Sequence, residues 1–170
     1  ADPEKLAQRG EYLFTTPTLS RNGKSSCATC HVPDRQFADG QRHSNGVFEA
    51  PGGANTPSLV ALGHIAAFPG RDAEGNTEAL TLEERCVAPI VNPLEMGSKI
   101  GPVLVRLEED EVARWKFGAS FPENGPVITE ETIGRALAAY WRTLELEKTP
   151  YGQYLRGETR ALTYQQEEGL

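Results

Sequence analysis

The sequence predicts an all-α fold. Apolar residues recur at helical spacing in several segments, most clearly between residues 129 and 146. Capping boxes of the form Ser/Thr-x-x-Glu/Gln begin at Thr81 and Thr163 and mark the first turns of two helices. No segment alternates apolar and polar residues convincingly enough to indicate a strand. The 170 residues suit one domain with a substantial core.

The first helix is predicted to begin at Asp2-Pro3, where an N-cap acceptor precedes a proline at the first helical position. Four residues then share one face at helical spacing: Leu6, Gly10, Leu13 and Phe14. Residues 15–56 should be mostly loop, because Gly, Asn, Ser and Pro recur throughout them. A loop of that length in a compact domain needs something that organises it.

Helix is expected to resume over residues 56–68, before a polar loop over residues 70–78. The helix that begins at Thr81 should end before Pro93, which breaks the chain. Three later helices are expected at residues 102–107, 109–117 and 129–146. The last capping box starts a helix that is cut off at Leu170.

The long loop contains Cys27-Ala28-Thr29-Cys30-His31, a C-x-x-C-H sequence, which is the attachment signature of a c-type haem. Cys27 and Cys30 would form thioether bonds to the haem vinyl groups, and His31 would be the proximal iron ligand. A zinc site needs four ligands, and only Cys86 and two scattered histidines remain to complete one. A thioredoxin-type motif should follow a strand, whereas loop residues precede this one. Covalent haem is therefore the prediction.

Composition and charge bear on the binding partners and the cellular location of the protein. The net charge is −7 and no basic run is present, which argues against nucleic-acid binding. No apolar stretch is long enough to span a membrane. The beginning Ala1-Asp2-Pro3 is typical of a mature end left by signal-peptide removal, and covalent haem is attached outside the cytoplasm, so we expect a periplasmic protein. Cys86 is expected to be a small buried apolar residue.

Several further phrases occur in a consistent order: Phe37-Ala-Asp-Gly40, Asn55-Thr-Pro-Ser-Leu59, Pro89-Ile-Val-Asn-Pro-Leu-Glu-Met-Gly97 and Ala136-Leu-Ala-Ala-Tyr-Trp-Arg-Thr-Leu144. With the C-x-x-C-H motif, they resemble the bacterial di-haem cytochrome c peroxidase family, which includes the MauG-like enzymes. The resemblance implies a class I cytochrome c-like haem domain with long loops over residues 1–160, corresponding to the family's N-terminal, peroxide-reactive domain. Residues 161–170 then correspond to the start of a linker or of a second domain that is not present.

The resemblance assigns chemistry to three positions. Glu95 falls on the family's distal carboxylate, which takes the peroxide proton and returns it to the leaving oxygen; the alternative is a solvated glutamate at a helix end. Arg85 falls where the family usually has a glutamine of the distal pocket, and an arginine there could stabilise the departing hydroxide. Its alternative is a surface pairing with Glu84 or Glu78. Asn55 matches a residue that helps to bind calcium between the family's two domains.

The sequence also departs from the family pattern on the distal side. Many members have a histidine just after a Ser-x-Gly turn, but here Ser44-Asn45-Gly46 is followed by Val47. Either the distal face of the haem is open, or His43 on the same loop takes that place as the distal ligand. His64, on the helix expected at residues 56–68, is interpreted as a structural histidine.

A second departure concerns electron transfer. The family has a tryptophan relay between its haems, where this chain has Phe68-Pro69-Gly70-Arg71. Trp115 and Trp141 lie elsewhere, on helices where core packing is the expected role.

Three functions remain open. The leading hypothesis is an oxidoreductase that reduces hydrogen peroxide at the His31-ligated haem, with electrons from a redox partner such as a small cytochrome, or from a second haem domain or chain. The alternative is a mono-haem electron carrier in which Met96, the only methionine, is the distal ligand. The third is a haem subunit of a larger redox complex. The acidic net charge favours a partner with a basic docking face.

Overall fold

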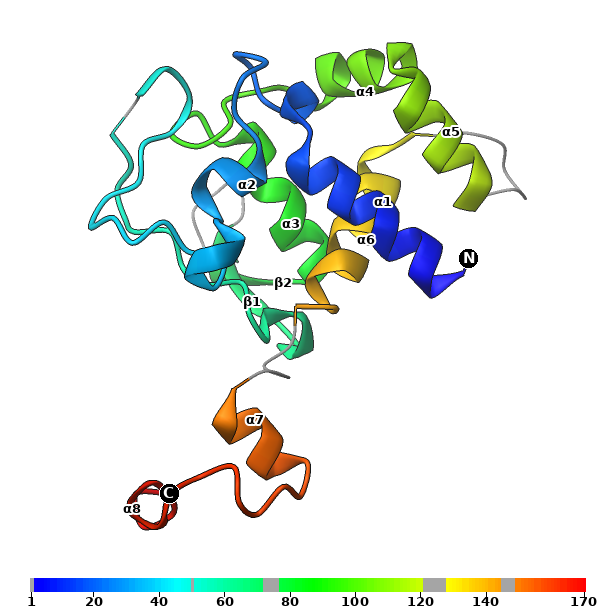
Figure 1. The fold of residues 1–170 in the computed structure, drawn as a ribbon. Helices are drawn as coiled ribbons and strands as arrows, with labels where there is room; N and C mark the ends of the chain where they lie inside the picture. Colours follow the sequence, from blue (N-terminus) through cyan, green and yellow to red (C-terminus); the bar gives the residue numbers. More distant parts are fainter. Residues whose placement is uncertain (1, 50, 72–76, 121–127, 145–148) are drawn as a thin grey trace.

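The computed structural model describes residues 2–49, 51–71, 77–120, 128–144 and 149–170, and these residues are mainly helical (Figure 1). The helices are α1 (Pro3–Thr15), α2 (Cys27–Cys30), α3 (Leu82–Val91), α4 (Ile100–Glu109), α5 (Glu111–Ser120), α6 (Glu130–Trp141), α7 (Pro150–Leu155) and α8 (Tyr164–Glu167). Within the described ranges, residues 16–67 contain α2, short 3-10 turns and isolated bridges but no longer element, which confirms the predicted loop over residues 15–56. None of the described helices has the length and apolarity needed to cross a membrane.

Helix α1 begins as predicted. The Asp2 side chain accepts a hydrogen bond of 3.0 Å from the backbone N–H of Glu4, and Pro3 follows it in the first turn. The helix then crosses α6 at Gly10, where a Cβ would lie 2.0 Å from the carbonyl oxygen of Ala136. Glycine therefore permits a backbone approach that no other residue allows.

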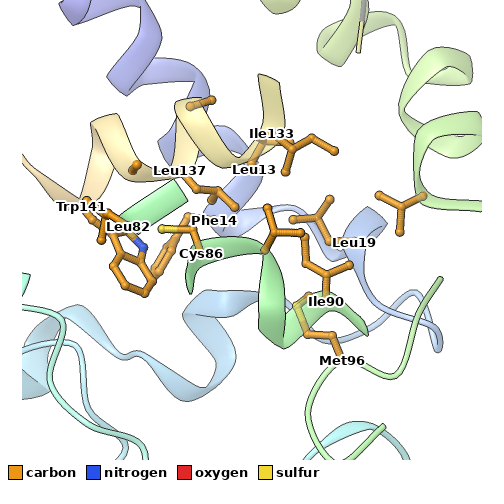
Figure 2. Close-up of a cluster of buried hydrophobic side chains, with 14 of the residues drawn as sticks. Leu13, Phe14, Leu19, Leu82, Cys86, Ile90, Met96, Ile133, Leu137 and Trp141 are labelled. Atoms are coloured by element: carbon orange, nitrogen blue, oxygen red, sulfur yellow. The ribbon is translucent and has the colours of Figure 1, made fainter. Parts of the chain in front are cut away.

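The core lies where α1, α3 and α6 meet (Figure 2). Each helix contributes the apolar face that its spacing predicted. The central side chains of this core are Leu13, Phe14, Leu82, Cys86, Ile90, Ile133, Leu137 and Trp141. Cys86 is 3% exposed and is a free thiol, which agrees with the buried apolar role expected for it.

Both capping boxes found in the sequence cap helices. The Thr81 backbone N–H donates to the Glu84 carboxylate at 2.8 Å, and the Glu84 N–H donates back to the Thr81 hydroxyl at 3.2 Å. Thr163 and Gln166 exchange the same pair of bonds at the beginning of α8. These signals work from sequence alone because every participating atom lies within one turn.

Two expectations for the middle of the chain are wrong. Residues 56–68 do not form a helix, since they contain only a 3-10 turn at Leu62–His64. Ala61 adopts a left-handed conformation, and its N–H donates to the carbonyl of Leu144 at 2.8 Å. Gly63 packs against the backbone of Arg142, which a Cβ there would approach to 2.6 Å. Contacts with the end of α6 therefore override the local helical pattern.

The polar loop expected at residues 70–78 instead contributes to a β-hairpin. Strands β1 (Phe68–Arg71) and β2 (Thr77–Leu80) pair antiparallel, with Phe68 opposite Leu80 and Arg71 opposite Thr77. The strands are short and mostly exposed, so no alternation of apolar and polar residues signals them. The residues between the strands lie outside the described ranges.

The last predicted long helix is shorter than expected, because α6 ends at Trp141 and residues 145–148 lie outside the described residues. Helices α4 and α5 confirm the two short helices, with bounds that extend by a few residues. Trp141 is 8% exposed and belongs to the core as predicted, but Trp115 on α5 is 72% exposed, so the core role expected for it is wrong. Figure 1 shows α7 and α8 set apart from the body that contains α1, α3 and α6.

Candidate haem site

The single-turn helix α2 presents the two cysteines of the C-x-x-C-H motif. Cys27 and Cys30 are its first and last residues, and a spacing of three places both side chains on one helix face. The backbone N–H of Ser26 donates to the Thr29 hydroxyl at 3.0 Å and holds the entry to the turn. Both cysteines are free thiols. Burial raises the pKa of Cys27 to about 12 and also raises that of Cys30, so both remain protonated at neutral pH.

His31 is oriented by a backbone carbonyl. Its Nδ1 lies 2.8 Å from the carbonyl oxygen of Phe37, and because a carbonyl can only accept, Nδ1 carries the proton. Burial lowers the pKa of His31 and outweighs the opposite effect of the Phe37 and Pro57 carbonyls, which favours the neutral ring with Nε2 unprotonated. Gln36 and Phe37 both have positive φ, at 55° and 59°, and this turn aims the Phe37 carbonyl at the imidazole.

These residues fit a covalently attached haem. Two thiols on one face of a helical turn, followed directly by a neutral imidazole with an unprotonated Nε2, are the donor set that a c-type haem uses. Cys27 and Cys30 would hold the porphyrin, and His31 would ligate the iron. The fixed Nδ1 proton is the second contact that metal-ligating histidines usually make.

An aromatic cluster surrounds the imidazole. The Phe14 ring, from α1, lies 6.3 Å from that of His31 and 6.0 Å from that of Phe37. Tyr140, from α6, packs 5.2 Å from Phe14 on the other side. The crossing of α1 and α6 therefore supplies the aromatic side chains that pack beside the predicted proximal histidine, His31.

Glu95 lies on a tight loop that follows α3. The N–H groups of Glu95 and Gly97 both donate to the carbonyl of Asn92, at 3.0 and 2.8 Å. The Asn92 side-chain amide donates to the Glu95 carboxylate at 2.8 Å, and Glu95 is otherwise exposed. Burial is the main cause of the raised pKa of Cys27 and Cys30, and the negative charge of Glu95 contributes to both shifts. The Glu95 carboxylate therefore lies within electrostatic reach of both cysteines of the motif.

The turn Ser44-Asn45-Gly46 packs between the cysteines and the Glu95 loop. A Cβ on Gly46 would lie 2.0 Å from the Leu94 carbonyl oxygen, and the Val47 N–H donates to the Glu95 carbonyl at 2.7 Å. On its other side, the Cys30 thiol lies 3.8 Å from the carbonyl of Asn45. Val47, which follows this turn, is buried.

Arg85 projects from α3, half-buried. After the larger effect of burial, its positive charge lowers the pKa of His31, and it also acts on Cys86. Glu84 is one of the two surface partners expected for Arg85. Its carboxylate accepts hydrogen bonds from the backbone N–H and the hydroxyl of Thr81, both at 2.8 Å. The structure thus brings Arg85 within electrostatic reach of His31, the predicted proximal ligand.

The structure adds Asp39, which lies within the phrase Phe37-Ala-Asp-Gly40, to the site. Burial alone would raise the pKa of Asp39, but hydrogen bonds from Ser44, Gln41 and Thr56 outweigh it and lower the pKa. The resulting negative charge acts on both Cys30 and His31. Its signal in the sequence was its position in a motif shortly after the C-x-x-C-H segment.

Four other candidates lie in different surroundings. His43 and Asn55 are exposed on the long loop, whereas Met96 is 6% exposed within the core cluster. The side chain of His64 lies outside the described residues. Within the described ranges no three His, Cys, Asp or Glu side chains gather to hold a metal ion, so calcium at Asn55 stays a prediction.

A mainly helical chain that presents a C-x-x-C-H turn against two crossed helices, here α1 and α6, is a c-type cytochrome-like haem protein. The family model described as di-haem cytochrome c peroxidase matches residues 4–160. The chain belongs to the di-haem cytochrome c peroxidase family, which uses haem c.

Similar proteins support this assignment. The chain is 33% identical over 170 residues to cytochrome c peroxidase Ccp of Escherichia coli, and the match covers 99% of this chain and 34% of that protein. It is also 33% identical to methylamine utilization protein MauG of Paracoccus denitrificans, over 92% of this chain and 46% of that protein. The cytochrome c551 peroxidase of Pseudomonas aeruginosa is 33% identical over 98% of this chain and 47% of its own length. The chain thus spans less than half the length of these relatives.

Solved structures agree on the fold. A crystal structure of a MauG-like protein associated with microbial copper homeostasis matches with a TM-score of 0.79 and 33% identity, covering 98% of this chain and 47% of that one. The diheme peroxidase BthA of Burkholderia thailandensis matches with a TM-score of 0.73 at 22% identity, covering 99% of this chain and 48% of that one. The latter likeness concerns the fold alone.

Proposed function

We propose that this chain is the peroxide-reducing haem unit of a cytochrome c peroxidase or MauG-like oxidoreductase. The observation that carries the proposal is the placement of Glu95, a carboxylate on a braced loop within electrostatic reach of both haem-attachment cysteines. The bound haem would supply an iron at which hydrogen peroxide is reduced. Residues 1–160 would form this unit, and residues 161–170 would begin a linker or a second domain.

Glu95 and Arg85 have distinct roles in this proposal. The Glu95 carboxylate accepts a proton from the peroxide and returns it to the departing oxygen, as a general base and then a general acid. The Asn92 amide, 2.8 Å from it, holds the carboxylate in place while leaving it accessible to solvent. Arg85 stabilises the negative charge that develops on the leaving hydroxide.

The electrons come from outside the described site. We propose that the electron donor is a small cytochrome, a second haem domain or another haem chain. We also propose that the protein is exported and works in the periplasm. The net charge of −7 favours a donor with a basic docking face.

The decisive experiment is rapid mixing of the ferric holoprotein with one equivalent of hydrogen peroxide, followed by its Soret absorption. Glu95→Gln keeps the size of the side chain and removes its base, so the second-order rate should fall by about 10²-fold or more. Glu108→Gln, an exposed carboxylate on α4, serves as the control and should react at the rate of the unchanged protein.

Two results would contradict the proposal. Equal rates for Glu95→Gln and Glu108→Gln would remove Glu95 from the reaction. A low-spin ferric spectrum with a methionine-to-iron charge-transfer band, inert to peroxide and lost in Met96→Leu, would replace the peroxidase by an electron carrier.

A further inference from the structure

Aromatic rings form a continuous path from the proximal histidine to the surface of α6. Phe14 is 1% exposed, and its ring centroid lies 6.3 Å from that of His31 and 5.2 Å from that of Tyr140. Both separations lie within the range of packed aromatic pairs. Tyr140 is half-buried, so the path ends at a side chain that solvent can reach.

The helix crossing holds this path rigidly. A Cβ on Gly10 would lie 2.7 Å from the Cβ of Tyr140, which shows how closely α1 passes over the base of the tyrosine. Phe14 lies one turn further along the same helix and packs on the Tyr140 ring from there. The contact between the two rings is therefore set by the packed helix backbones and does not depend on a mobile loop.

The surroundings of Tyr140 suit a group that loses a proton together with an electron. Burial raises the pKa of Tyr140, and the negative charge of Glu11 raises it further, so the side chain is a neutral phenol. Glu11 is exposed on α1 and supplies a carboxylate that can accept the phenolic proton.

Trp141, the neighbouring residue, lacks such an acceptor. It is 8% exposed, and its buried Nε1 has no hydrogen-bond partner within the described ranges. An indole that is oxidised there would have no described group to receive its N–H proton. This difference favours Tyr140 over the core tryptophan as the residue that loses an electron together with a proton.

We infer that Tyr140 is a redox-active side chain that carries oxidising equivalents from the haem to the protein surface. The inference rests on the proposed peroxidase function, because the oxidant is the haem group after it has reduced hydrogen peroxide. The Tyr140 phenol gives one electron to that group through Phe14 and His31, and its proton passes to Glu11 or water. The resulting neutral phenoxyl returns to phenol by taking one electron and one proton from a reducing partner.

The test uses the holoprotein, frozen at intervals after mixing with one equivalent of hydrogen peroxide, and records Soret absorption and EPR in parallel. The unchanged protein should show an organic radical whose hyperfine pattern narrows when the protein carries ring-deuterated tyrosine. Tyr140→Phe keeps the packing on Phe14 and should abolish this signal while the Soret change persists. Tyr151→Phe, an exposed tyrosine on α7, is the matched control and should leave the signal unchanged.

The remaining outcomes separate the two proposals. A Soret change without a radical overturns the role of Tyr140 and leaves the peroxidase function standing. The same conclusion follows from a radical that survives in Tyr140→Phe and is lost in Trp141→Phe. The absence of any Soret change overturns both proposals, because no oxidant for Tyr140 is then produced. Support for the proton route would come from Glu11→Gln, in which the radical should form more slowly.

Discussion

Tyr12 illustrates how one side chain links two elements that are distant in sequence. Its hydroxyl donates to the Asp110 carboxylate, which also caps α5 by accepting from the N–H groups of Val112 and Ala113 at 2.9 and 3.1 Å. Burial, and then the bond to Asp110, raise the pKa of Tyr12 to about 12. The two ends of this link are 98 residues apart, so no local pattern predicts it.

The link predicts a specific dependence of stability on pH. In the unfolded chain a tyrosine ionises near pH 10, whereas folded Tyr12 keeps its proton to about pH 12. Its contribution is therefore complete below pH 10 and is lost as the pH rises towards 12. Tyr12→Phe should lower the free energy of unfolding by about 1 kcal/mol at pH 7, and this difference should shrink above pH 10. Denaturant unfolding across pH 7–11 measures it.

The control for this prediction is Tyr151→Phe, because Tyr151 is exposed on α7. Its unfolding free energy should differ from that of the unchanged protein by a constant amount at every pH. A Tyr12→Phe difference that stays constant above pH 10 would contradict the role assigned to the bond with Asp110.

At the scale of elements, the crossing of α1 over α6 determines the geometry of the site. The crossing places Phe14 beside both His31 and Tyr140, and Gly10 lets the backbones approach. The neighbouring crossing of α3 over α6 uses Gly134 in the same way, since a Cβ there would lie 2.8 Å from the Glu83 carbonyl. Small residues at these points allow helices to pack at short range.

A glycine-to-alanine pair tests the crossing. Gly10→Ala should destabilise the protein by about 3 kcal/mol or more, because its methyl group meets backbone that cannot yield without separating the helices. Gly101→Ala, at an exposed position of α4 with nothing within 4 Å of its Cβ, should instead be neutral or stabilise by up to about 1 kcal/mol. Thermal unfolding of the two variants distinguishes these effects, and equal melting temperatures would show that the crossing has room for a side chain.

At the scale of the whole molecule, two parts of the described chain differ in what holds them together. The helices α1, α3 and α6 share one apolar core (Figure 2). The long loop instead contains short 3-10 turns and two isolated bridges, Val32 with Ala38 and Asn45 with Pro51. A covalent haem would give this loop the apolar body that its own residues do not supply.

Removal of haem attachment should therefore affect the loop first. In the double variant Cys27→Ser/Cys30→Ser, amide hydrogen exchange should accelerate over residues 21–49 much more than over α1 and α6, because these two helices share a core made of their own side chains. Exchange followed by mass spectrometry of peptides compares this variant with the holoprotein. A uniform loss of protection would show instead that loop and core unfold as one cooperative unit.

The comparison of sequence and structure shows which signals are reliable. The Asp2 N-cap and the boxes at Thr81 and Thr163 were predictable because each involves atoms within one helical turn. The helix expected at residues 56–68 failed because Ala61 bonds to Leu144, a contact that local periodicity does not encode. Trp115 was assigned to the core from residue type alone, and its position on an exposed face of α5 reversed that assignment.

The sequence by itself determined the helical class and the family, and it predicted Cys27, Cys30 and His31 as the haem-attachment triplet, because motif spacing and capping are local properties. Only the tertiary structure decided what surrounds the triplet. The Phe37 carbonyl that orients His31 comes from a left-handed turn, and the charge of Glu95 reaches the cysteines because its loop packs on Gly46. Such contacts depend on backbone approach between separate segments, which becomes defined only when the chain is packed.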